Sequence, residues 1–104
     1  MPEVLSAPKG HKVLLENEHV RVLEVRIKPH ESSGLHSHPH CVVYQISDAT
    51  VKMSTSDGKS RVVNGKQGDI VWSEGGVHEV ENIGETDDYG IIVELKKYSL
   101  IEEY

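Results

Sequence analysis

Short apolar runs separated by turn residues recur along the whole chain, and this spacing restricts the fold more than any other feature of the sequence. In residues 20–27 the apolar side chains are interspersed with Arg21, Glu24 and Arg26, the alternation typical of a strand with one buried face. The pair Asp57-Gly58 separates two strand-like segments and is a typical hairpin turn. Before the last few residues, no segment has the sustained spacing of an amphipathic helix. The sequence therefore predicts an all-β fold of many short strands.

The turn signals also set approximate bounds for the expected strands. These are residues 13–15, 20–27, 42–46, 51–54, 61–64, 70–72, 78–82 and 91–95. Many short antiparallel strands must either close on themselves or pack as two sheets, because exposed edges favour aggregation. A jelly-roll β-barrel is the interpretation that meets this requirement, and an immunoglobulin-like sandwich is the alternative.

The length of 104 residues is that of a single domain, and the absence of phenylalanine predicts an aliphatic core. We expect an N-terminal arm over residues 1–10, which contain two prolines and a glycine, and one barrel domain over residues 11–104. A small barrel leaves strand edges, and Val4-Leu5 in the arm could add to a neighbour's sheet. A homodimer is therefore expected.

The net charge of −6 argues against nucleic acid and anionic membranes as partners, because both attract basic surfaces. No run of eighteen apolar residues is present to span a bilayer, and the first ten residues do not resemble a signal peptide. The single cysteine, Cys41, cannot form an internal disulfide. We predict a cytoplasmic protein whose partner is a small molecule.

Histidine is the compositional outlier, with seven residues in the chain and four of them within residues 30–40. His36 and His38 are two positions apart, so on a strand both imidazoles point to the same face. Two neutral nitrogens that converge from one strand are suited to a metal ion, at a distance of roughly 2 Å. His78 follows a glycine loop at the start of another strand and is the best candidate for a third ligand.

The remaining candidates have alternative interpretations. His11 and His19 are interpreted as surface or hydrogen-bonded residues without a metal role. His40 has the same parity as His36 and His38, and is a rim residue, a proton shuttle or group behind the ligands, or a fourth ligand. Tyr44 shares this parity, and either offers its hydroxyl to a substrate or packs in the barrel lining. His40 and Tyr44 are thus the catalytic candidates beside the metal ligands.

Two stretches resemble the two motifs of the cupin superfamily. The sequence GLHSHPH at residues 34–40, followed by VVY at 42–44, resembles the first motif. The sequence GDIVWSEGGVHEVEN at residues 68–82 resembles the second. The resemblance covers about residues 16–96. It implies a six- to eight-stranded jelly-roll barrel with a metal ion near one mouth.

The chain departs from the cupin motifs at the place of a metal-binding carboxylate. The first motif normally has a glutamate four or five residues after its second histidine, where this chain has Val42 and Val43. Glu74 also replaces the proline of the second motif, and one residue fewer separates Gly76 from His78. The resemblance therefore implies a site of three histidines without a carboxylate.

Three neutral imidazoles leave a bound ion with its full charge and with open positions, which suits anionic chelating ligands and, on iron, O₂. The three-histidine cupins that this chain resembles include thiol dioxygenases and a diketone-cleaving dioxygenase. We predict one divalent transition-metal ion, with Fe(II) favoured over zinc, nickel, manganese or copper, in a dioxygenase that acts on a small chelating substrate. A non-catalytic binding or sensor module and a metal-dependent isomerase or lyase are the alternatives.

Overall fold

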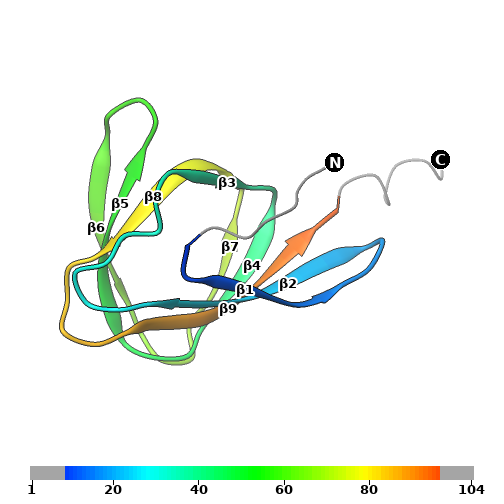
Figure 1. The fold of residues 1–104 in the computed structure, drawn as a ribbon, viewed down its shortest axis with the longest axis horizontal. Helices are drawn as coiled ribbons and strands as arrows, with labels where there is room; N and C mark the ends of the chain where they lie inside the picture. Colours follow the sequence, from blue (N-terminus) through cyan, green and yellow to red (C-terminus); the bar gives the residue numbers. More distant parts are fainter. Residues whose placement is uncertain (1–8, 97–104) are drawn as a thin grey trace.

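The structure is a computed structural model that describes residues 9–96, and within this range the chain forms nine strands and no helix (Figure 1). The strands are β1 (His11–Glu16), β2 (Val20–Ile27), β3 (His36–His38), β4 (Cys41–Gln45), β5 (Ala49–Thr55), β6 (Ser60–Gly65), β7 (Ile70–Ser73), β8 (Gly76–Asn82) and β9 (Asp88–Leu95). The prediction of an all-β chain is confirmed, and the strand predicted at residues 20–27 has the observed bounds.

The strands form two antiparallel sheets. The first has five strands in the order β1-β2-β9-β4-β7, and the second has four in the order β3-β8-β5-β6. Within residues 9–96 the two sheets are separate hydrogen-bonded ladders, so the expected barrel is not closed. The jelly roll here consists of two packed sheets.

The core lies between the two sheets and is aliphatic, as the composition predicts. Leu23, Val25 and Ile27 of β2 are buried on one face and contact a cluster that includes Val51 of β5 and Val80 of β8. Alternate residues of β2 are thus the ones that pack inward, which is the period of a strand with one buried face. This arrangement places every inward-facing side chain of β2 in or beside the space between the sheets.

A β-bulge in β1 determines which face His11 occupies. Leu15 pairs with Val22, and continued regular pairing would place His11 opposite the exposed Arg26. The register instead shifts by one residue between positions 13 and 15, so His11 pairs with Val25, whose side chain is buried. Because a shift of one residue exchanges the two faces of a strand, the bulge turns His11 inward.

The predicted arm at residues 1–10 lies mostly outside the described residues, and Val4 and Leu5 are among those not described. The division into an arm and a domain over residues 11–104 therefore stays a prediction. Residues 9–96 contain no helix of the length and hydropathy needed to cross a membrane.

Candidate metal site

The pairing of β3 with β8 brings the three predicted ligands together. His36 lies directly opposite His78 in the ladder, so their side chains share a face. Their Nε2 atoms are 3.1 Å apart. The rings of His36 and His38 have centroids 4.7 Å apart, and those of His38 and His78 are 5.4 Å apart. The prediction that alternation on one strand directs His36 and His38 to the same place agrees with this geometry.

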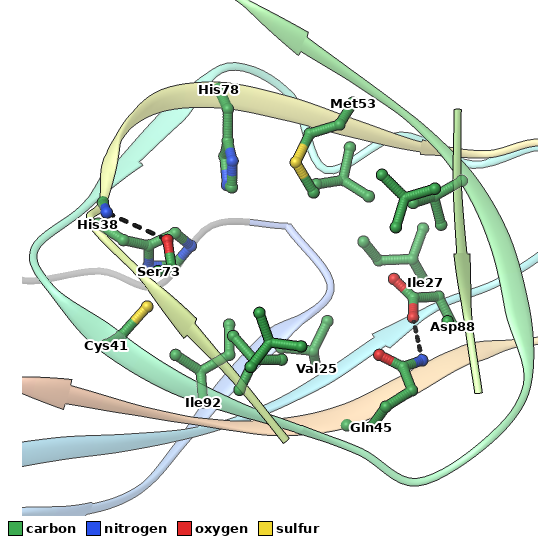
Figure 2. A pocket seen from close by; sticks show the side chains of 18 of the residues that line it. Val25, Ile27, His38, Cys41, Gln45, Met53, Ser73, His78, Asp88 and Ile92 are labelled. Carbon is green, nitrogen blue, oxygen red and sulfur yellow. Dashed lines mark hydrogen bonds between the residues drawn. The ribbon is translucent and has the colours of Figure 1, made fainter. Parts of the chain in front are cut away.

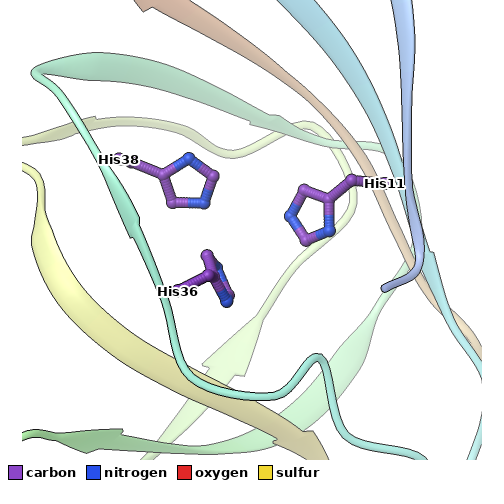
Figure 3. Close-up of side chains that lie close together, drawn as sticks. All are labelled: His11, His36 and His38. Carbon is purple, nitrogen blue, oxygen red and sulfur yellow. The ribbon is translucent and has the colours of Figure 1, made fainter. Parts of the chain in front are cut away.

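His11 joins this group from the opposite sheet (Figure 3). Its ring centroid lies 5.2 Å from that of His36 and 5.5 Å from that of His38. One ring nitrogen from each of these three residues lies within 4.8 Å of the other two, close enough to hold a metal ion in common. His11, interpreted from the sequence as a surface or hydrogen-bonded residue without a metal role, is thus placed beside His36 and His38 by the structure. Its inward orientation depends on the bulge in β1, which no residue pattern in the sequence indicates.

Three of the imidazoles each have a hydrogen-bond acceptor at Nδ1. These acceptors are the carbonyl oxygens of Lys9 (3.1 Å) and Gly34 (2.8 Å) and the carboxylate of Glu94, which contact His11, His36 and His38 respectively. A carbonyl oxygen or carboxylate can only accept, so Nδ1 is the protonated nitrogen of each ring. The lone pair of each neutral ring is then on Nε2, which is the atom left to bind a metal.

The surroundings of His11, His36 and His78 favour the neutral form of imidazole that metal binding requires. Burial and, to a smaller extent, the neighbouring histidines together lower the pKa of His78 to about 4. Burial likewise lowers the pKa of His11 to about 4, against a smaller opposing effect of its hydrogen bond to the Lys9 carbonyl. The pKa of His36 is lowered for the same principal reason, its burial. At neutral pH these imidazoles are therefore available as ligands without loss of a proton.

A carboxylate lies behind the histidines, where the sequence predicts none. Glu94 on β9 bonds His38 through Oε2, and its Oε1 accepts from Nε of Arg21 at 2.8 Å. Burial acts to raise the pKa of the Glu94 carboxyl, but the hydrogen bonds from His38 and Arg21 outweigh burial and hold the pKa below its usual value. The signal that could have found Glu94 is a single charge within the apolar run at residues 91–95.

The histidines line one end of a cavity of about 1030 Å³ between the sheets. Figure 2 shows His38 and His78 at this end, and Gln45 and Asp88 at the other. The walls between them are mostly aliphatic, formed by Val25, Ile27, Val43, Val51, Met53, Val63, Val80 and Ile92. Burial raises the pKa of Asp88, and a hydrogen bond of 2.8 Å from Gln45 Nε2 partly offsets this. The cavity therefore has two polar ends and an apolar middle, which is typical of a small-molecule site.

Comparison with protein-family models and with the curated proteins finds no match. Comparison with solved structures finds a cupin domain of Bordetella pertussis, with a TM-score of 0.76 and 28% sequence identity over 83% of this chain and 91% of that one. It also finds an RmlC-like cupin family protein with a double-stranded β-helix fold from Methanocaldococcus jannaschii (TM-score 0.65, 20% identity, 82% and 77% covered). The chain has the cupin fold. A predicted oxalate decarboxylase of Thermotoga maritima is similar as well (TM-score 0.54, 24% identity, 83% and 79% covered).

The two catalytic candidates of this chain lie away from the histidine group. The His40 side chain is 60% exposed, and it lies beside the Trp72 ring and 3.4 Å from the Glu74 carboxylate. Tyr44 is 45% exposed and faces outward, whereas Val43 beside it lines the cavity. The shared parity does not hold because β3 ends at His38 and β4 starts at Cys41 in the other sheet. The structure thus agrees with the rim placement of His40, and Tyr44 does not line the cavity.

Gly75, in the stretch that resembles the second cupin motif, packs closely against the backbone at the end of β3. Its φ is +83°, and a Cβ at this position would lie 2.6 Å from the carbonyl oxygen of Pro39 and would also overlap that of His38. We expect Gly75→Ala to displace the β3 end and to weaken metal binding at least tenfold, measured by Co(II) titration. Gly58→Ala is the matched control, because Gly58 also has a positive φ, +89°, and a Cβ there would meet no atom within 4 Å. Equal Co(II) affinity in both variants would contradict the role of Gly75.

Proposed function

We propose that this cupin binds one divalent transition-metal ion on its cluster of inward-facing histidines. His36 and His38 belong both to the predicted ligand set and to the group whose nitrogens lie within 4.8 Å, and His11 and His78 complete the cluster. The observation that carries the proposal is the set of acceptors at Nδ1, which leaves Nε2 as the ligand nitrogen of His11, His36 and His38, and Nε2 of His36 lies 3.1 Å from that of His78. Imidazole nitrogen is a ligand that iron, zinc, nickel and copper all accept.

We further propose that the bound metal serves an oxygen-dependent reaction of a small chelating substrate. When bound, such an ion supplies Lewis acidity and, as iron, the one-electron chemistry that a reaction with O₂ requires. The chain's own contribution is the cavity: its mostly aliphatic walls can pack against the apolar part of a substrate, and the histidine end can position its chelating atoms. Asp88 and Gln45 at the other end can hydrogen-bond a polar group of the substrate.

Oxygen consumption tests this activity. We expect the Fe(II)-loaded protein to consume O₂ in the presence of a small thiol or β-diketone, and expect His38→Ala to abolish the consumption, as measured with an oxygen electrode. Tyr44→Phe is the control, since Tyr44 faces away from the cavity, and it should retain the wild-type rate. Turnover of a substrate without O₂ would instead favour a lyase or isomerase, and oxalate belongs in that assay because one similar structure is a predicted oxalate decarboxylase. Binding of a ligand without any turnover would favour a binding or sensor module.

The homodimer, the cytoplasmic location and the absence of nucleic-acid partners stay predictions. β1 is an edge strand of the five-stranded sheet and exposes Leu14 and Leu15, so one edge is open to pairing within the described part of the chain.

A further inference from the structure

Arg21, Glu94 and His38 form a buried polar chain behind the histidine cluster. Arg21 and Glu94 are directly opposite one another in the β2–β9 ladder, and both face the interior. Glu94 is 3% exposed and His38 is 7% exposed, while the Arg21 side chain is 17% exposed. Both oxygens of the Glu94 carboxylate are used, one by the guanidinium and the other by the imidazole.

Burying these three hydrogen-bonded polar side chains is costly, which favours a role for them other than stability. Removing a carboxylate from water costs several kcal/mol, and attraction to partners only partly offsets this, so a buried ion pair is weak evidence for a stabilising role. The cost is incurred here at a position where a leucine or valine would continue the apolar run of β9. The geometry instead resembles a carboxylate–histidine–metal arrangement, in which the carboxylate fixes the tautomer and direction of the ligand ring.

We propose that Glu94 is a positioning residue for the metal site, an inference that rests on the proposed metal binding. By accepting a hydrogen bond from Nδ1–H of His38, Glu94 holds this ring with Nε2 directed to the metal, and Arg21 holds Glu94. The carboxylate thereby supplies from β9 the negative charge that positions 42 and 43 lack. The strand pairing places Glu94 close to these positions, because Glu94 lies opposite Cys41 on β4 and Cys41 precedes Val42.

Glu94→Gln tests the proposal with two independent readouts. The amide keeps the shape of the side chain but removes its charge, and its NH₂ group can donate to Nδ1 and so favour the other tautomer of His38. We expect Co(II) affinity, from titration of its visible absorption bands, to fall about 10–100-fold. In the metal-free protein, long-range ¹H–¹⁵N NMR spectra should show His38 protonated at Nδ1 in the wild type and a population protonated at Nε2 in the variant.

Glu24→Gln is the matched control for charge removal. Glu24 lies on β2 with the opposite parity to Arg21 and accepts a hydrogen bond from the Tyr89 hydroxyl at 3.1 Å. It should change neither the Co(II) affinity nor the His38 signals. Arg21→Lys keeps a positive charge but loses the Nε–H donor, and should produce a smaller change of the same kind as Glu94→Gln.

The outcomes separate this proposal from the metal site itself. Wild-type Co(II) affinity in Glu94→Gln, with His38 still protonated at Nδ1, would overturn the positioning role. A wild-type protein that binds no Co(II) would overturn the proposed metal binding, and the NMR comparison of metal-free proteins would still decide whether Glu94 sets the tautomer of His38. If Glu94→Gln does not fold, as judged by circular dichroism, the same two measurements on Arg21→Lys decide: unchanged affinity and an unchanged tautomer overturn the proposal.

Discussion

Replacing both His36 and His38 with alanine should reduce the bound metal from about one equivalent to near zero, as measured by elemental analysis of the purified protein. These two residues are shared by the predicted ligand set and by the observed group of three histidines. Loss of two of the converging nitrogens leaves too few protein ligands for a stable site. Circular dichroism of the variant should remain that of a folded β protein, because β3 is only three residues long.

Single substitutions then show how the other two rings take part. We expect both His11→Ala and His78→Ala to weaken binding, because each ring lies beside His36, at 5.2 Å and 4.7 Å between centroids. His19→Ala is the control, since that exposed histidine lies at the turn after β1. If the wild-type protein stays metal-free after incubation with Fe(II), Mn(II), Ni(II) and Zn(II), the proposed function is wrong.

The second large effect is expected at Asn82, the asparagine of the second motif. Its side chain is fully buried. Its Nδ2 donates to the carbonyl oxygens of Ile27 at 2.9 Å and Thr86 at 2.8 Å, while Oδ1 accepts from the Gly84 amide at 2.9 Å. Alanine would remove all three hydrogen bonds, of which the one to the Ile27 carbonyl oxygen is buried and the other two are partly buried, so Asn82→Ala should lower the free energy of unfolding by about 2–4 kcal/mol, measured by urea denaturation.

Asn64→Ala is the control for the second effect. Asn64 is exposed on β6, and its Oδ1 accepts one hydrogen bond of 2.8 Å from the Thr50 hydroxyl. Because water can replace that partner, the same substitution should cost no more than about 0.5 kcal/mol. Similar losses in the two variants would show that the Asn82 hydrogen bonds do not hold the end of β2 to the loop before β9.

The positions of the strands along the chain follow from local features of the sequence. Alternation fixed residues 20–27 as a strand, because only period-two spacing gives an extended segment one apolar face. Turn residues such as Asp57-Gly58 delimited most of the other strands, and the spacing His36-Ser37-His38 placed two imidazoles on the same face of β3. These properties depend only on residues close together in the sequence, not on which strands pair in the fold.

Which residues join His36 and His38 in the site depends on pairing between strands that are distant in the sequence. His11 faces inward because of a one-residue bulge, and Glu94 reaches His38 because β9 lies between β2 and β4 in the sheet. Tyr44 turns outward because the chain changes sheets after His38, so its parity is no longer tied to that of the histidines. The sequence by itself determined the strands, the aliphatic core and the paired histidines of β3. Only the tertiary structure decided which other side chains meet them, because register and sheet order are set by contacts far apart in the chain.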